Sequence, residues 1–146
     1  MSFCMNWDCC SKSADNGLNP YATNIKQITI QNQNFRTAVW TGCYLQMTLM
    51  CIPEHEEIGL EFHADTDQFI RIEQGKATVK MGKCKNRLDF QQNICEGDGV
   101  FIPAGTWHNI INIEKTPLKI SSIYAPPNHL KGTIHQTKSE AEKEEY

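Results

Sequence analysis

The stretch that decides the fold is Gly97-Asp-Gly-Val-Phe-Ile-Pro103-Ala-Gly105-Thr-Trp-His108-Asn-Ile-Ile-Asn112. Residues 100–102 have the apolar character of a short buried strand. Pro103 and Gly105 then indicate a sharp turn, because proline fixes φ and glycine allows unusual backbone angles. A second β-like run carries His108 directly after that turn. We therefore expect this imidazole to be held on rigid backbone, where one of its nitrogens can face a metal ion.

Length and composition indicate a single globular domain. The chain has 146 residues, of which 40% are hydrophobic and 21% charged, and it is long enough to bury a core. The formal net charge of −3 provides no basic surface, so a nucleic-acid partner is not expected. No apolar run is long enough to span a membrane, and the first ten residues lack the pattern of a signal peptide. The expected location is the cytoplasm, with no membrane partner.

The distribution of β-forming residues predicts an all-β fold. Apolar or alternating runs occur at 25–30, 35–40, 44–52, 58–63, 68–72, 77–81, 87–90, 100–102, 107–113 and 118–124. Many short strands at regular spacing are typical of a β-sandwich or a β-barrel. A helical pattern occurs at the end, where Thr137 and Glu140 have the spacing of a capping box for a short helix over 139–145. We expect a flexible N-terminal arm (1–25), a barrel (26–125) and a C-terminal tail with the short helix (126–146).

The seven cysteines allow two interpretations. Their odd number excludes a complete set of disulfides within one chain. Free thiols in a reducing compartment are the main expectation, with Cys51 and Cys95 as small core residues. The alternative is a soft-metal or redox site formed by Cys4, Cys9 and Cys10 near the N-terminus.

The spacing Gly97-x5-Pro103-x-Gly105-x2-His108-x3-Asn112 resembles the second signature motif of the cupin family at every fixed position. The resemblance extends over roughly residues 40–125. It implies an all-β, single cupin barrel, also called a double-stranded β-helix or jelly roll, followed by a short C-terminal helix. Among cupins, the chain is similar to small single-domain members, including mannose-6-phosphate-isomerase-like proteins.

The first cupin motif is present in altered form. Counting back from Gly75 places Gln68 where the family has a glutamate, His63 at the second histidine and Glu61 at the first. Two of the four positions that bind metal in the family are therefore changed in residue type. With His108 from the second motif, the resemblance implies a metal site made of Glu61, His63, Gln68 and His108.

The residues themselves support the same set of ligands. Glu61 and His63 are two apart, so on a strand both would face the same side. Two histidines and one carboxylate form the facial triad that suits non-haem Fe(II), and the same donors also suit Zn, Mn or Ni. Gln68 is either a fourth ligand or a hydrogen-bond partner of a metal-bound water. Glu61 is also the candidate catalytic residue, because a carboxylate that is not a tight ligand can move protons.

Three classes of function remain open for one bound divalent metal ion. The first is a metal-dependent enzyme acting on a small oxygen-rich substrate, in the manner of sugar or sugar-phosphate isomerases. No inward-facing cluster of basic residues is evident, which counts against a phosphorylated sugar. The second class is a non-haem Fe(II) dioxygenase. The third is a small-molecule binding module without turnover.

Some residues and segments are expected to lie at the edge of the site or outside it. Tyr124 ends the last strand and can line the pocket, whereas Arg71 is out of register with Gln68 and is expected to face outward. His129 and His135 lie in the tail beyond the barrel, and we expect neither in the site. The β-like segment 25–40 has no obvious partner inside the barrel. We therefore expect a homodimer in which this segment crosses the interface.

Overall fold

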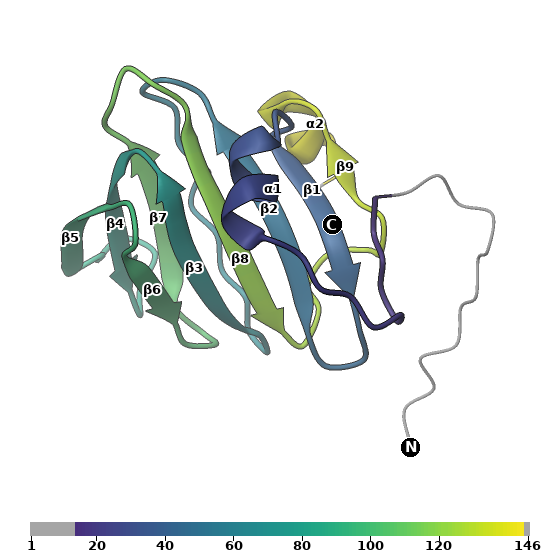
Figure 1. Ribbon diagram of the computed structural model, residues 1–146. Coiled ribbons are helices and arrows are strands. Elements are labelled where there is room, and N and C mark those ends of the chain that lie inside the picture. The colour runs from purple at the N-terminus through teal and green to yellow at the C-terminus, as the bar shows by residue number, and fades with distance from the viewer. Residues whose placement is uncertain (1–13, 145–146) are drawn as a thin grey trace.

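The computed structural model describes residues 14–144, which fold into two antiparallel sheets (Figure 1). In chain order the elements are α1 (Ile25–Gln31), β1 (Arg36–Thr41), β2 (Gln46–Ile52), β3 (Asp67–Gln74), β4 (Lys76–Gly82), β5 (Phe90–Cys95), β6 (Gly99–Ile102), β7 (Trp107–Asn112), β8 (Leu118–Ala125), β9 (Ile134–His135) and α2 (Lys138–Lys143). One sheet has the order β6-β3-β8-β2-β1-β9 and the other β5-β4-β7. The all-β jelly roll with a short C-terminal helix is confirmed. Cys4, Cys9 and Cys10 lie outside the described residues.

Alternation of side chains sets the interior of the larger sheet. In β3, Gln68, Ile70 and Ile72 are buried on one face, while Arg71 between them is exposed. The strands predicted at 35–40, 44–52, 68–72, 77–81, 100–102, 107–113 and 118–124 are confirmed to within two residues. Each of these strands buries at least one face, so its sequence has the apolar periodicity from which a strand can be predicted.

The strand predicted at 25–30 is wrong, because this segment is helix α1. Asn24 caps the helix, and its side chain accepts a hydrogen bond from the Gln27 backbone N–H. Thr29 is fully buried, and Ile28 packs against Val39, Met47 and Leu49 on the outer face of the larger sheet. β-Branched residues favour strands, but the cap and tertiary packing override that preference here.

Two further strand predictions are wrong. Residues 58–63 form an irregular segment with isolated bridges, and Gly59 within it has φ 103, a left-handed conformation that interrupts a strand. Residues 87–90 mostly precede β5, which runs over Phe90–Cys95 instead. Most of β5 is exposed and its centre is polar, so it carries little of the apolar alternation that reveals a strand.

The C-terminal segment folds back along the larger sheet. β9 pairs with β1 in the register Arg36↔His135, so segment 35–41 has partners in its own chain. That pairing removes the reason for which a crossing into a second subunit was expected. Helix α2 begins as the capping pattern predicts, because the Thr137 hydroxyl accepts a hydrogen bond from the Glu140 backbone N–H. Figure 1 shows β9 and α2 at the β1 edge of the sheet. Neither helix of residues 14–144 is long and apolar enough to cross a membrane.

Candidate metal centre

His108 lies near the start of β7 and is 2% exposed. Its Nδ1 lies 2.9 Å from the Thr106 carbonyl oxygen. Because a carbonyl only accepts hydrogen bonds, Nδ1 donates here and Nε2 keeps its lone pair. This is the usual way in which a protein fixes the tautomer of a histidine that binds metal.

Glu61 and His63 come from the irregular segment 58–66 and are held against β7 by backbone hydrogen bonds. The Glu61 N–H donates to the His108 carbonyl at 2.9 Å, and the His108 N–H donates to the Glu61 carbonyl at 3.0 Å. The Gly105 N–H donates to the His63 carbonyl at 2.8 Å. The two sequence motifs are therefore fixed to each other through the main chain.

The donor atoms of Glu61, His63 and His108 lie within 4.8 Å of one another. Glu61 Oε2 is 3.4 Å from His63 Nε2 and 3.7 Å from His108 Nε2. Both Nε2 atoms are buried and have no hydrogen-bond partner among residues 14–144. Ligands about 2.1 Å from one ion lie roughly 3.0–3.4 Å apart, so small side-chain shifts would seat a metal ion. The structure thus brings three of the four predicted ligands together as a candidate metal-binding triad.

Glu61 is ionised by its surroundings. Burial alone would raise the pKa of its carboxyl group. The adjacent His108 and His63 side chains and the Arg36 guanidinium lower it by more than burial raises it, so the pKa of Glu61 lies well below the usual range. Arg36 Nη2 lies 3.3 Å from Glu61 Oε1. One carboxylate oxygen therefore faces the arginine, while the other faces the two imidazoles.

Arg36 is a site residue that the sequence analysis missed. Its side chain is buried in the interior, where Nη1 lies 3.3 Å from His135 Nδ1. No inward-facing cluster of basic residues was expected, and Arg36 is a single basic residue that faces the interior. Arg36 and Ala38 are two residues apart in β1, so their side chains lie on the same face of the strand. This alternation could have indicated that Arg36 faces the interior, although a charged residue in a strand is usually assigned to the surface.

Gln68 faces the interior from β3, as its register with Ile70 and Ile72 predicted. It is 4% exposed, and its Oε1 has no hydrogen-bond partner among residues 14–144. A buried amide oxygen without a partner is costly unless a metal ion or water satisfies it. Whether Gln68 ligates the metal stays a prediction.

A cavity of about 240 Å³ adjoins the triad. Its walls come from β1, the segment after β8, β9 and α2, and it is lined by Arg36, Phe62, His63, Asn128, His129, Thr133, His135, Ala141 and Glu144. The placement of His129 and His135 outside the site is therefore wrong. The C-terminal tail carries both of them back over the mouth of the barrel, which local sequence patterns do not reveal.

Tyr124 lies beside the triad, as expected. Its ring meets the His63 ring edge-on with centroids 5.9 Å apart, and it meets the His129 ring edge-on with centroids 5.1 Å apart. Burial raises the pKa of the Tyr124 hydroxyl to about 12. Burial and then the charge of Arg36 lower the pKa of His129 to about 3. Both side chains are therefore neutral near pH 7.

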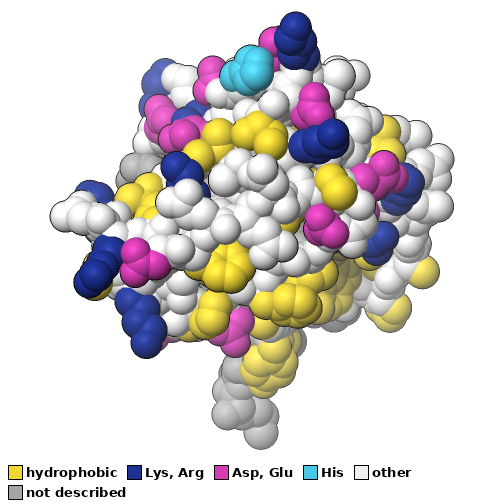
Figure 2. Space-filling view, turned by 90° about the vertical axis from the view of Figure 1, so that its left-hand side faces the viewer, with side chains coloured by type: hydrophobic (Ala, Val, Ile, Leu, Met, Phe, Trp, Pro, Cys, Tyr) yellow, Lys and Arg dark blue, Asp and Glu magenta, His cyan; other side chains and the backbone are white. Residues whose placement is uncertain are grey.

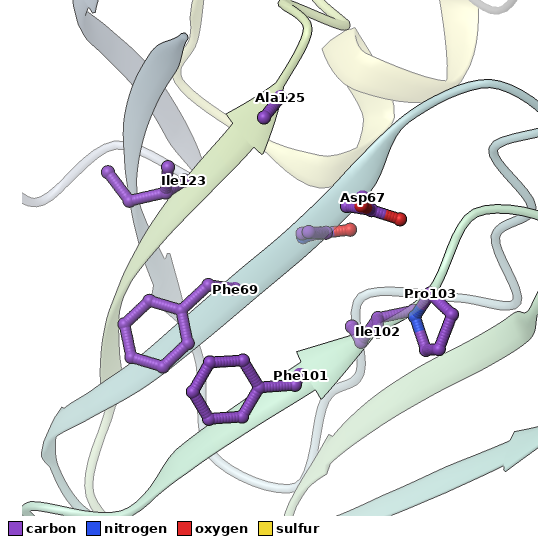
Figure 3. Close-up of a pocket in the computed structure, with 8 residues that line it drawn as sticks. Asp67, Phe69, Phe101, Ile102, Pro103, Ile123 and Ala125 are labelled. Atoms are coloured by element: carbon purple, nitrogen blue, oxygen red, sulfur yellow. The ribbon is translucent and has the colours of Figure 1, made fainter.

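A second hollow of about 300 Å³ lies on the outer face of the larger sheet (Figure 3). Phe69 of β3 and Phe101 of β6 lie side by side there, with ring centroids 4.8 Å apart. Asp67 borders this hollow, but its Oδ1 accepts a hydrogen bond from the Ala104 N–H and holds the turn. Arg71 also faces outward and pairs with Glu73 at 3.0 Å.

The described cysteines fit the expected thiols only in part. Cys51, Cys84 and Cys95 are free. Cys43 is disulfide-bonded, which corrects the expectation of a free thiol at this position. Cys95 is exposed and Cys51 is half-buried, so neither is a core residue.

The two-sheet barrel and its interior triad define a class of protein. Residues 48–124 match the family of cupin domains, and the chain belongs to the cupin family. It is 55% identical to the uncharacterized protein YrkC of Bacillus subtilis over 87% of this chain and 68% of that protein. It is 41% identical to the uncharacterized protein L612 of Acanthamoeba polyphaga mimivirus over 78% of this chain and 70% of that one. The crystal structure of BH2720 from Bacillus halodurans superposes with a TM-score of 0.88 at 48% identity, covering 88% of this chain and 98% of that one.

Proposed function

We propose that this cupin is a metal-dependent enzyme that binds one divalent ion through Glu61, His63 and His108, with Gln68 as a fourth ligand. The observation that carries the proposal is the pair of buried imidazole Nε2 atoms that face one carboxylate oxygen and have no hydrogen-bond partner among the described residues. Two buried imidazole nitrogens that face one carboxylate oxygen without hydrogen-bond partners are costly unless a cation lies between them.

The charges of the site favour an oxygen-rich or anionic substrate. Arg36 offsets the single negative charge of Glu61, so a divalent ion would leave the centre with a net positive charge. Such an ion acts as a Lewis acid and holds adjacent carbonyl, hydroxyl or carboxylate oxygens. A cavity of about 240 Å³ lined by several polar side chains suits a small molecule. The reaction that we propose is isomerisation of a small sugar or sugar phosphate, in the manner of mannose-6-phosphate-isomerase-like cupins.

An oxygen-activating enzyme is the second candidate. Two histidines and one carboxylate are the donor set of many non-haem Fe(II) oxygenases, and the triad reproduces that set. A third candidate, a binding module without turnover, shares the metal site but predicts that Glu61→Ala changes no reaction.

Metal content tests the site and separates the first two candidates. Protein purified without a metal-affinity tag should contain close to one equivalent of a divalent metal by elemental analysis. The double variant His63→Ala/His108→Ala should contain almost none, while His55→Ala, which changes an exposed histidine on a loop, should retain it. Equal metal content in all three proteins would refute the site. Zinc without iron, also after reconstitution under anaerobic conditions with Fe(II), would exclude the oxygenase.

We also propose a homodimer formed through the outer face of the larger sheet rather than through segment 25–40. Phe101 is 76% exposed and lies on β6, an edge strand of that sheet. Figure 2 views the side of the molecule that carries β5 and β6, and hydrophobic side chains gather in its lower half. Light scattering should give twice the chain mass of 16.7 kDa, and Phe101→Lys should give the monomer. A monomeric wild-type protein would exclude the dimer.

We place the protein in the cytoplasm, with a small molecule as its only substrate class. The free thiols of Cys51, Cys84 and Cys95 support a reducing compartment, whereas the disulfide at Cys43 argues against it. The net charge of −3 supports the absence of a nucleic-acid partner. Fractionation of cells that express the chain, followed by thiol labelling, tests the location.

A further inference from the structure

The cavity beside the triad holds a carboxylate that belongs to the chain itself. Glu144, which caps the C-terminal end of helix α2, lines this cavity together with His135 of β9. Its Oε2 lies 2.6 Å from His135 Nε2, a short distance for a hydrogen bond between nitrogen and oxygen. The cavity therefore contains a position at which one imidazole nitrogen binds a carboxylate oxygen.

His135 is built into the fold as the donor at this position. It is 4% exposed, and the pairing of β9 with β1 holds its backbone at the sheet edge. Its Nδ1 lies 3.3 Å from Arg36 Nη1. Because a guanidinium group can only donate hydrogen bonds, Nδ1 accepts, and the ring hydrogen is on Nε2. The neutral imidazole thus donates its N–H to Glu144 at the cavity.

Arg36 connects this position to the candidate metal centre. Its Nη1 contacts His135, and its Nη2 lies 3.3 Å from Glu61 Oε1. His63 lines the same cavity. A molecule that fills the cavity therefore contacts a predicted metal ligand and His135 alike, with a guanidinium charge between them that favours an anion.

Glu144 is held loosely where it lies. Its side chain is 58% exposed, and α2 contains no buried residue. Ala141 of this helix is only partly buried where it packs against the core. A segment with few buried apolar contacts opens at a low cost in free energy. Another carboxylate can therefore replace Glu144 while the barrel stays folded.

We propose that His135 Nε2 binds the carboxylate of the substrate, and that Glu144 occupies this subsite when no substrate is bound. This inference rests on the proposed metal-dependent function and narrows its substrate class to a sugar acid, a sugar that carries a carboxylate. The metal ion would hold hydroxyl or carbonyl oxygens of the same molecule. Glu144 is then an internal competitor that the substrate displaces.

The donors of the subsite fit a carboxylate better than a phosphate. Among the described residues, Arg36 is the only arginine or lysine that lines the cavity, and its terminal nitrogens already contact Glu61 and His135. One imidazole N–H remains for the ligand. A phosphate group carries about 1.5–2 negative charges at pH 7 and three strong acceptor oxygens, and a single neutral donor leaves most of these unpaired. A carboxylate carries one charge, and Glu144 shows that the subsite accepts it.

The test measures binding to the full chain loaded with Zn²⁺ by isothermal titration calorimetry. The probes are D-glucuronate, D-glucose and D-glucose-6-phosphate, which differ only in the group at one end of the sugar. Glu144→Gln removes the charge of the competing side chain and keeps its shape. Glu142→Gln is the matched control, because it removes an equal charge from the same helix on a side chain that lines a different hollow. His135→Phe removes the donor of the subsite.

We expect Glu144→Gln to bind glucuronate about tenfold more tightly than wild type, as for a subsite that its competitor fills about 90% of the time. Glu142→Gln should stay within about twofold of wild type. Wild type should bind glucuronate more tightly than glucose, and His135→Phe should lose that preference, because the hydrogen bond to an ionised carboxylate is gone.

Equal glucuronate binding by wild type and Glu144→Gln would overturn the inference and leave the metal site intact. Tighter binding of glucose-6-phosphate than of glucuronate by Glu144→Gln would overturn the carboxylate class. A folded His135→Phe that still prefers glucuronate over glucose would overturn the role of His135. A wild-type protein that binds no Zn²⁺ would instead refute the proposed function.

Discussion

The two ends of the same three strands differ in character, although both lie inside the barrel. At one end, β2, β3 and β8 contribute only apolar side chains, namely Met50, Ile52, Ile70, Ile72, Leu118 and Ile120, each no more than 1% exposed. At the other end, the inward positions are Gln46, Thr48, Gln68, Ser122 and Tyr124, which are buried as deeply but are polar. Thr48 pairs with Ser122, and the next inward-facing pair along the same strands is Met50 and Ile120. The interior therefore changes from polar to apolar between two neighbouring inward-facing pairs.

This contrast shows how a small barrel separates stability from function. The apolar end gains free energy from burial, because each methylene removed from water contributes about 0.8 kcal/mol. The polar end gains much less, because its side chains give up hydrogen bonds to water on burial and Gln68 Oε1 has no hydrogen-bond partner among the described residues. The same strands hold both ends, so the packed end fixes the geometry of the polar one.

The largest effect on stability is expected at the apolar end. Ile120→Ala removes a side chain with no exposure from the centre of the larger sheet, and the cavity left behind should lower the free energy of unfolding by about 2–5 kcal/mol. Urea denaturation of the metal-free protein measures it. Metal affinity of the folded variant should change by less than threefold. A large loss of affinity would show that the two ends are not separable in this way.

The largest effect on metal binding is expected at the polar end. His63→Ala should raise the dissociation constant of Zn²⁺ at least about a hundredfold, equivalent to about 2.7 kcal/mol, because one of three convergent ligands is lost. Competition with a chromophoric chelator measures the constant, with His55→Ala as control. The metal-free variant should unfold within about 1 kcal/mol of wild type, since the packed end is unchanged. Tight zinc binding by His63→Ala would contradict the triad.

A smaller gain is expected from Gln68→Glu. The substitution places a carboxylate where a buried amide oxygen has no partner among the described residues, and an anionic oxygen is a stronger metal ligand than a neutral one. Zinc should bind about tenfold more tightly, while the metal-free protein becomes less stable because a charge is buried. Chelator competition and urea denaturation measure the two effects. Unchanged affinity together with unchanged stability would place the Gln68 side chain away from the metal.

The smallest effect is a pH dependence that originates at the polar end. His129 has a pKa of about 3 in the folded chain against an ordinary value of 6.5, so the unfolded chain binds a proton that the folded chain does not. The stability due to this difference is fully present above pH 6.5 and is lost progressively as the pH falls toward 3. Melting temperatures of metal-free wild type should drop between pH 7.5 and 5, and the drop should be smaller in His129→Gln. Identical pH profiles would show that His129 is solvated.

Sequence patterns were reliable wherever burial imposed a period. The strands of the barrel have apolar residues at every second position or in continuous runs, and Pro103 and Gly105 are residue types typical of a sharp turn. The spacing of the two motifs, through their resemblance to those of the cupin family, predicted Glu61, His63 and His108 in one site, although Glu61 and His63 lie on an irregular segment rather than on a strand. The patterns failed where local preference and tertiary packing disagree, as in helix α1, whose β-branched residues resemble a strand.

The chain's sequence by itself predicted the cupin barrel and the three donor residues of the candidate metal centre, because the spacing within each of two motifs resembles that of the cupin family. Only the tertiary structure showed that Arg36 engages Glu61 and that His129 and His135 line the cavity. These residues lie 25, 68 and 74 positions from Glu61 along the chain. No local period links positions so far apart, and their meeting results from β1 and β9 pairing at the sheet edge and from Gln46 holding the loop after β8.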